Sequence, residues 1–425
     1  MKIPSSTSST EQGRRLALPA ELQRRLAPVC AAARRLGSRL FLVGGPVRDL
    51  FLGLPVRDLD FACEGDAAEL ARDLGERLGG FVRLHGRFGT ATVAGPDGDR
   101  VDIAATRRET YDRPGALPRV EPAGIEEDLA RRDFTVNAMA LQVAPRLPGE
   151  LLDPFGGRAD LARRRLRILH AGSLRDDPTR AYRAARYANR LGFSVEASTR
   201  REAAAAAEAG AFDRISAERR RREIELLLSE PGRAGAVRWL ARLQLAGTLS
   251  AALDARPRTL ARLSAAESLL QGTYTHTIWI LYVLIWAAEL DGKQMLRLAE
   301  RLALRGRQGR ALRAWPATRA RLNRLPPRPS PSAFASLRLS GAEAAAAAIC
   351  APRSDVRLAA RRHLSRPVPA LAIGGADLIR AGVPSGPGIG RALAATLAAR
   401  MDGKISAEQE LSFALEAARK RAPDR

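Results

Sequence analysis

The sequence predicts an α+β protein with a mixed-sheet head at its N-terminal end and all-α parts after it. Strand-like and helix-like segments alternate up to about residue 155. From about Leu161 the chain reads as helix after helix, rich in Ala, Leu and Arg. With 425 residues the chain is too long for one compact core, so we expect several domains.

The head is expected to open with a helix over residues 18–36. A strand, a glycine turn and a short helix follow within "LFLVGGPVRDLFLG". Residues 58–63 predict a strand, and Asp66 is placed to cap the helix that ends at "LGG". The segments "RFGTATVA" and "RVDIAATR" alternate as strands do, with the turn "GPDGD" between them.

The helical remainder is divided by two breaks, "RLPPRPSPS" from Arg324 and "GVPSGPGIG" from Gly382, the second preceding a last helix. The longest apolar run, "TIWILYVLIWAAEL" from Thr277, is shorter than the ~20 residues that span a bilayer, so we expect a buried helix and no membrane association. Residues 1–17 are polar, without a signal sequence, and we expect them to be disordered.

The charge of the chain indicates a polyanionic partner. The formal net charge is +24, and nearly all the positive charge is Arg. A GC-rich genome explains Arg in place of Lys, but it does not explain the excess over acids, which favours a nucleic acid over a nonspecific basic surface. The three cysteines, Cys30, Cys63 and Cys350, are far apart, which predicts neither a disulfide framework nor a zinc site and fits a reducing, cytoplasmic setting.

Two acids follow the glycine turn. Asp58 and Asp60 are two residues apart at a predicted strand, so their side chains project to the same side. Such carboxylates repel each other unless a cation lies between them, and their oxygens suit Mg²⁺. A solvated strand end is the alternative, and the pair alone does not decide between them.

The glycine turn favours the metal interpretation. Gly44 and Gly45 let the backbone approach a ligand closely, and Pro46 suits the first turn of a helix. Helix N–H groups and Arg48 are then placed to bind phosphate oxygens. Glycines, an arginine and paired aspartates within one strand–helix–strand unit predict a site for a triphosphate and a metal.

A third acid, Asp102, lies in the middle of the strand "RVDIAATR" among apolar residues. We expect it beside Asp58 and Asp60 as a third catalytic carboxylate, and the alternative is a structural partner for an arginine. Three acids and two metal ions suit in-line attack on an α-phosphate.

Four ordered motifs carry a family resemblance: "LVGGPVRDLFLG…RDLDF", "EEDLARRDFTVNAMAL", "LLDPFGGRADLARRRLRIL" and "RDDPTRAYRAARYANRLGF". Between about residues 38 and 230 the chain resembles the class II tRNA nucleotidyltransferases, which are the CCA-adding enzymes and the related bacterial poly(A) polymerases. The resemblance implies a nucleotidyltransferase head over residues 18–155, a helical neck and body over 156–275 that recognises the base and binds RNA, and a helical, tRNA-binding tail over 276–425.

The resemblance also implies an activity, the addition of CCA or part of it to tRNA 3′ ends from CTP and ATP with Mg²⁺. It places the metals on Asp58 and Asp60. Further matching positions imply contacts with the nucleotide, at Gly45, Arg48, Arg132, Asp177, Arg180, Arg183 and Arg186. For Arg132 a structural pair with Asp133 is the alternative. "DPFGG", from Asp153, is interpreted as a turn that orients the next helix.

Within "DDPTRAYRAAR", Asp177 and Arg180 can explain which nucleotide bases are accepted. A carboxylate only accepts hydrogen bonds and a guanidinium only donates them. Cytosine and adenine offer an amino donor beside a ring-nitrogen acceptor, whereas uracil and guanine reverse that order. Asp177 and Arg180 therefore predict acceptance of CTP and ATP and rejection of UTP and GTP.

Several functions stay open on the sequence alone. An A-adding or CC-adding enzyme and a poly(A) polymerase would share this chemistry. A transferase acting on a small molecule would not need so basic a helical half, and a non-catalytic RNA-binding protein would not need the acids. The segment "RRETYDRPGALPRVEPAGIEEDL" is polar, interrupted by Pro and long, which is typical of a functional or a disordered loop. In the family, a flexible loop at this place takes part in the change from CTP to ATP.

Overall fold

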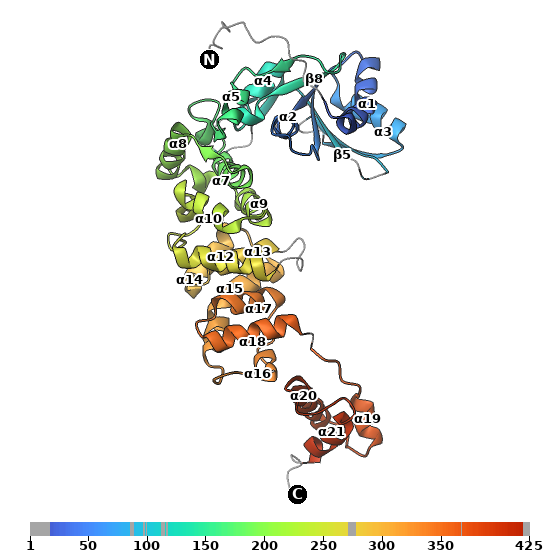
Figure 1. Cartoon of the computed structure of the whole chain (residues 1–425), viewed down its shortest axis with the longest axis vertical. Helices are drawn as coiled ribbons and strands as arrows, with labels where there is room; N and C mark the ends of the chain where they lie inside the picture. Colours follow the sequence, from blue (N-terminus) through green and yellow to red (C-terminus); the bar gives the residue numbers. More distant parts are fainter. Residues whose placement is uncertain are drawn as a thin grey trace. The chain divides into compact units, whose positions relative to one another are not determined.

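The computed structural model describes residues 18–85, 89–96, 98, 100–111, 115, 118–270, 278–366 and 368–419. Three predictions concern residues outside these ranges. They are the disorder of residues 1–17, the first strand residues of "RFGTATVA", Arg87 and Phe88, and part of the expected loop at 107–129. The chain forms two compact units, Met1–Ile215 and Ser216–Arg425. A mixed sheet in the N-terminal part of the chain is followed by a long series of helices, which confirms the predicted α+β class (Figure 1).

The main sheet of the first unit has seven strands in the order β3-β4-β5-β2-β1-β8-β9. It is mixed because β2 and β5 pair in parallel while the other neighbours are antiparallel. The strands are β1 (Arg39–Val43), β2 (Leu59–Glu64), β3 (Phe81–His85), β4 (Thr90–Ala94), β5 (Arg100–Ala105), β8 (Ala140–Ala144) and β9 (Leu151–Leu152). Two small sheets pair β6 (Arg107–Thr110) with β7 (Arg119–Pro122) and β10 (Arg165–Leu166) with β11 (Ser194–Val195).

The helices of the first unit surround this sheet and continue beyond it. They are α1 (Ala20–Arg35), α2 (Gly45–Phe51), α3 (Ala67–Leu78), α4 (Ile125–Ala130), α5 (Gly157–Ala162), α6 (Ser173–Asp176), α7 (Thr179–Leu191) and α8 (Ala197–Glu208), with 3₁₀ turns η2 (Thr135–Asn137) and η3 (Ala211–Arg214). Asp66 caps α3 as predicted, because its carboxylate accepts from the backbone N–H groups of Ala68 and Glu69.

A small apolar cluster fixes the strand ends that carry the acids. Phe41 and Val43 of β1 pack with Ala62 of β2, and Ile125 and Leu129 of α4 cover them. Burial of these side chains stabilises the unit by roughly 1.5–3 kcal/mol for each large one. The cluster therefore holds α4, and the segment after it, against the same strands as the acidic pair.

The turn "DPFGG" orients α5, as the sequence suggested. The Asp153 carboxylate accepts from the backbone N–H groups of Gly157 at 2.6 Å and Arg158 at 2.9 Å. A Cβ at Gly157 would lie 2.4 Å from the carbonyl oxygen of Thr135, so only glycine allows α5 to approach η2 this closely.

Within its described residues, the second unit contains helices and no strands. The helices are α9 (Ala217–Ser229), α10 (Arg233–Arg242), α11 (Leu245–Leu249), α12 (Pro257–Leu269), α13 (Ile278–Trp286), α14 (Gly292–Arg301), α15 (Gly306–Asn323), α16 (Pro331–Ala335), α17 (Gly341–Cys350), α18 (Ser354–Ser365), α19 (Gly375–Arg380), α20 (Pro387–Met401) and α21 (Glu410–Arg419). The apolar run forms α13, which is buried from Trp279 to Trp286 and packs against the alanine-rich α17. Among the helices of the described ranges, none combines the length and the hydropathy of a membrane-crossing segment.

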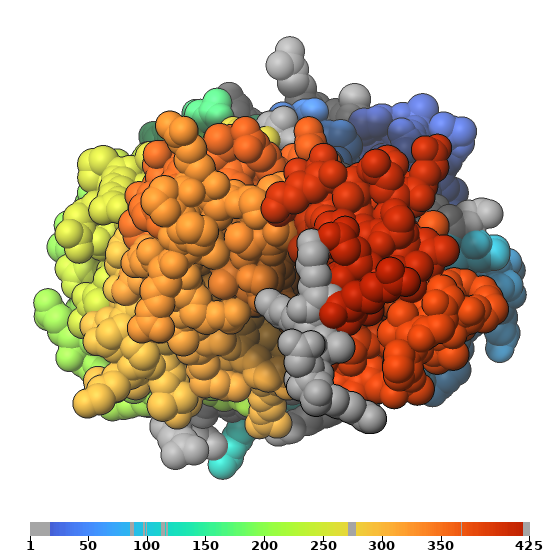
Figure 2. All heavy atoms as spheres, turned by 90° about the horizontal axis from the view of Figure 1, so that it is seen from below, coloured from blue at the N-terminus to red at the C-terminus, as the bar shows by residue number. Residues whose placement is uncertain are grey.

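The C-terminal segment forms a small core of its own. Leu378, Ala392 and Ala414 are buried together, one from each of α19, α20 and α21. The surface of α20 and α21 is drawn in red in Figure 2. The expectation of a single last helix after "GVPSGPGIG" is wrong, because the turn at Gly403 ends α20 and α21 folds back onto it.

Candidate active site

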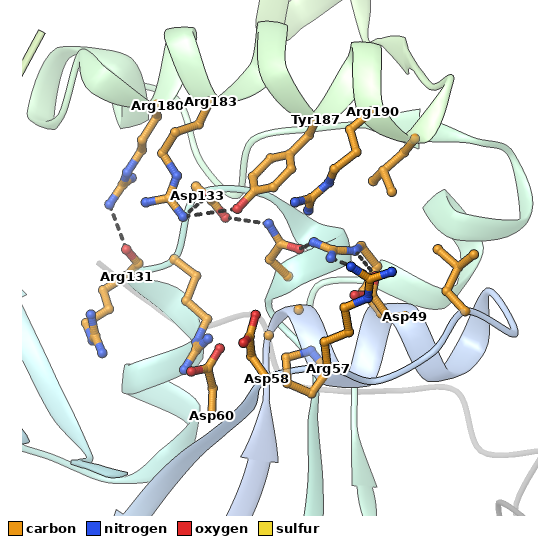
Figure 3. Close-up of a pocket in the computed structure, with 18 of the residues that line it drawn as sticks. Asp49, Arg57, Asp58, Asp60, Arg131, Asp133, Arg180, Arg183, Tyr187 and Arg190 are labelled. Carbon is orange, nitrogen blue, oxygen red and sulfur yellow. Dashed lines mark hydrogen bonds and ion pairs between the residues drawn. The ribbon is translucent and has the colours of Figure 1, made fainter. Parts of the chain in front are cut away.

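A cavity of about 770 Å³ in the first unit gathers most of the predicted site residues. Its wall combines the start of β2, the start of α2, the segment after α4 and one side of α7 (Figure 3). The predicted residues that line it are Gly44, Gly45, Arg48, Asp58, Asp60, Arg132, Asp177, Arg180 and Arg183. Asp102 and Arg186 do not line it.

The acidic pair lies on one side of the cavity. Asp60 belongs to β2 and Asp58 directly precedes that strand, and both carboxylates point into the cavity in Figure 3. Burial, followed by the charges of Asp102 and Asp58, raises the pKa of Asp60 to about 6, although Arg132 and Arg100 oppose the shift. The nearby cations therefore do not neutralise this group of acids.

A divalent cation fits this surplus of negative charge. Within the described ranges, no three His, Cys, Asp or Glu side chains come together as a ready-made metal cage. Mg²⁺ is usually held by one or two carboxylates plus waters and substrate phosphates, and oxygen ligands are its preferred donors. Asp58 and Asp60 supply two carboxylates at the wall of an open cavity, so the residues present fit such an ion.

Asp102 lies beside the pair, on the neighbouring strand. It is in register with Asp60 across the parallel β2–β5 pairing. Its carboxylate accepts from the hydroxyl of Thr92 at 2.6 Å and from the Arg100 guanidinium at 3.0 Å. The geometry therefore contains both features that the sequence suggested, a third acid near the pair and a partner for an arginine, and its catalytic role stays a prediction.

The glycine turn makes room for an arginine. Gly44 has a φ of +73°, and a Cβ there would lie 2.8 Å from a guanidinium nitrogen of Arg132. That guanidinium is held by Asp128, one helical turn earlier, at 2.9 Å. The suggested pair between Arg132 and Asp133 is wrong, since Asp133 is bound instead by Arg183 at 2.7 Å.

A chain of buried polar contacts joins α2 to α7. Arg48 is 3% exposed, pairs with Asp49 at 2.7 Å and donates to the Asn137 side chain at 2.7 Å. Asn137 in turn donates to Asp133 at 3.0 Å, and Asp133 pairs with Arg183. Burial disfavours the charge of Asp133, but Arg183 and Asn137 outweigh it and hold the pKa of Asp133 below its usual range.

Hydrogen bonds to neighbouring groups hold Asp177 and Arg180, the proposed base-reading pair, in place. The Asp177 carboxylate accepts from the backbone N–H of Thr179 at 3.0 Å and from its hydroxyl at 2.7 Å. Arg180 donates to the Ser173 hydroxyl and to the Arg131 carbonyl, each at 2.6 Å, and is 4% exposed. These contacts fix the planar guanidinium in one orientation, as a hydrogen-bonding template requires.

Tyr187 is a residue that the sequence did not single out. Four guanidinium groups lie near its ring, with distances to the centroid of 5.4 Å for Arg48, 6.0 Å for Arg183, 5.0 Å for Arg186 and 5.0 Å for Arg190. Cation–π attraction offsets part of the repulsion among these cations. Its position one helical turn after Arg183 was the available signal, but an aromatic residue at helical spacing is more often a core residue.

The sequence of the chain is similar to those of known proteins. The model of the poly A polymerase head domain matches residues 40–167. The chain is 33% identical to the CC-adding tRNA nucleotidyltransferase of Deinococcus radiodurans over 91% of each chain. It is 44% identical to the A-adding tRNA nucleotidyltransferase of Halalkalibacterium halodurans over 47% of each chain. That match and those to two other A-adding relatives span less than half of the relative's length.

The fold is also that of a solved structure. A CCA-adding enzyme in an apo form superposes on the chain with a TM-score of 0.80 and 28% identity, covering 94% of this chain and 96% of that one. The likeness extends across both units, and the head-domain match includes the acidic pair and the glycine turn.

Proposed function

Because the chain belongs to the class II tRNA nucleotidyltransferase family, we propose that it extends tRNA 3′ ends without a nucleic-acid template, adding CCA or part of it from CTP and ATP. The observation that carries this proposal is the content of one cavity. An acidic pair that suits a metal faces arginines that suit a triphosphate, and an Asp and an Arg that suit cytosine and adenine line the same space.

The acids and the arginines would bind different parts of the metal-bound nucleotide. Asp58 and Asp60 would hold Mg²⁺, which lowers the pKa of an attacking ribose hydroxyl and neutralises the leaving pyrophosphate. Arg48 and Arg183, fixed by the contacts through Asn137 and Asp133, would bind phosphate oxygens. Because these groups are positioned before the nucleotide arrives, little reorganisation is needed in the transition state.

A basic face on α15 supports RNA as the acceptor. The helix contains no Asp or Glu, and its exposed arginines fall within about one third of the circumference at 3.6 residues per turn. They are Arg307, Arg310, Arg313 and Arg321, and Arg324 continues the face directly after the helix. Among the ion pairs of the described part of the chain, none includes these five. Like charges three residues apart destabilise a helix, so a polyanionic partner is a better explanation than a solvated face.

We expect the double variant Arg310→Gln/Arg313→Gln to bind tRNA about tenfold more weakly in moderate salt, because two phosphate contacts are lost. The slope of log affinity against log salt should become shallower by about two, as measured by fluorescence anisotropy over a range of KCl concentrations. Arg72→Gln/Arg83→Gln, with the same change in net charge at exposed positions of the head, is the matched control. Equal affinities and equal slopes for the two double variants would exclude the α15 face from RNA binding.

Tyr187→Leu should raise the KM for CTP and ATP by about tenfold or more, because Arg48, Arg183 and Arg190 lose the aromatic ring that holds them around the cavity, at roughly 0.5–1 kcal/mol for each contact. Tyr187→Phe keeps the ring and should behave as wild type. Initial-rate measurements with each nucleotide provide the test. If Leu and Phe gave the same KM, the ring would have no part in ordering the arginines.

The choice among family activities can be decided with acceptors of different length. Purified protein is incubated with tRNAs that end at the discriminator base, at C or at CC, with labelled CTP or ATP, and product lengths are resolved on a gel. CCA completion on all three supports the full activity, and addition of A to the CC-ended tRNA alone indicates an A-adding enzyme. A long ladder of A residues indicates a poly(A) polymerase, and no extension of any acceptor contradicts the proposal.

A further inference from the structure

A second cavity adjoins the first and has no part in the proposed transfer. It is open, has a volume of about 980 Å³ and lies between the end of α2, α5 and the end of α7. Leu54, Arg190 and Leu191 line both cavities, so the two share a wall. Among the described residues, the only acid that lines it is Asp153, whose carboxylate already accepts from two backbone N–H groups of α5.

The second cavity presents guanidinium groups mounted on apolar supports. Arg158 lies over the Phe51 ring at 5.7 Å, and Arg164 lies over the Phe193 ring at 5.8 Å. Both arginines are exposed, and within the described residues neither forms an ion pair. Stacking fixes one face of each guanidinium. One N–H group of Arg164 donates to the Leu191 carbonyl at 3.4 Å, and the remaining N–H groups of both arginines lie in the guanidinium planes, where an anion can accept them.

The direction of α7 relates this cavity to the leaving group. Arg180 lies near the base-reading end of the first cavity, and Arg190 lies at the wall shared with the second (Figure 3). Ten residues of α-helix separate them by about 15 Å, which is close to the extended length of a nucleoside triphosphate. With the base beside Arg180, the β- and γ-phosphates point toward Arg190 and the mouth of the second cavity.

From these observations we infer that the second cavity binds inorganic pyrophosphate as it leaves the site. This inference rests on the proposed function. In that reaction the 3′ oxygen of the RNA bonds to the α-phosphorus, the bond from this phosphorus to the bridging oxygen breaks, and the hydroxyl proton passes to solvent. Pyrophosphate keeps the bridging oxygen and carries three to four negative charges, for which Arg158, Arg164 and Arg190 provide the matching cations.

Calorimetric titration with pyrophosphate tests the assignment in the full-length protein. Saturating CTP without RNA fills the first cavity while no transfer takes place, so the titrant cannot bind there. We expect wild type to bind pyrophosphate under these conditions and Arg158→Gln/Arg164→Gln to bind it about tenfold more weakly, because two charge-assisted hydrogen bonds are lost. Arg163→Gln/Arg201→Gln, which removes the same charge from exposed positions outside the cavity, should match wild type.

The steady-state constants should separate in the same way. The inhibition constant of pyrophosphate should rise in Arg158→Gln/Arg164→Gln while the KM for CTP stays unchanged. Equal pyrophosphate affinity in the two double variants would overturn the inference, and so would a parallel rise in the KM for CTP, which would make the cavity part of the nucleotide site. If wild type extended no RNA yet showed the expected difference in calorimetry, the proposed function would fail while the anion site remained.

Discussion

We expect Asp60→Asn to lower kcat for nucleotide addition by about 10³-fold or more, and Asp58→Asn to do the same. Each substitution removes one of the two carboxylates that fit the metal, and metal-assisted stabilisation of a phosphoryl-transfer transition state is worth several kcal/mol. Single-turnover incorporation of labelled CTP into tRNA provides the measurement. Asp73→Asn is a suitable control, because Asp73 pairs with Arg35 of α1 and Arg77 of α3 and does not line the cavity.

Asp60→Asn should not weaken the fold. Burial and the charges of Asp102 and Asp58 raise the pKa of Asp60 to about 6, above its ordinary value, so the folded protein disfavours the ionised form. For an acid with a raised pKa, stability is lost as the pH rises through the shifted range, and at pH 7 the full cost is present. Asparagine removes that cost. We therefore expect a Tm at pH 7 equal to or above that of wild type, and a Tm well below it would mean that lost activity reports unfolding.

Features with a local cause could be predicted from the sequence. Asp66 caps α3 through N–H groups two and three residues away, and the glycine turn that begins α2 follows directly from "GGP". The spacing of Asp58 and Asp60 likewise places both on one side of a strand end. In each case the interacting groups are close neighbours in the chain, so a short stretch of sequence contains the whole signal.

Contacts between distant segments could not be predicted in this way. Asp133 proved to pair with Arg183 of α7, far along the chain, so no stretch of sequence around Asp133 contains the signal for its partner. Strand β3 was not predicted from the sequence. Its apolar residues Phe81 and Leu84 are exposed at the sheet edge, so the alternation of apolar and polar residues that marks a strand is weak. Three of the arginines around Tyr187 lie on its own helix, but Arg48 joins them only when α2 packs against α7 across the cavity.

The largest expected change in specificity concerns Asp177. In Asp177→Ala the acceptor for the exocyclic amino group is gone, so the preference for CTP over UTP should fall by about 10- to 100-fold, as expected from one or two unsatisfied polar groups at ~1–3 kcal/mol each. Arg180 keeps its contacts with Ser173 and the Arg131 carbonyl, so half of the template stays in place. Asp58 and Asp60 lie outside this pair, and metal-dependent turnover with CTP should persist at a reduced rate.

The structural role of Asp177 requires a control, because its carboxylate also binds Thr179 at the start of α7. Thr179→Val removes the hydroxyl contact but keeps the carboxylate, so it weakens the helix start without changing the acceptor. It should lower the Tm and leave the ratio of kcat/KM for CTP and UTP unchanged, whereas Asp177→Ala changes that ratio. If single-turnover assays showed the same discrimination against UTP in wild type and Asp177→Ala, the carboxylate would not read the base. Selection would then have to come from Arg180 and the backbone around it.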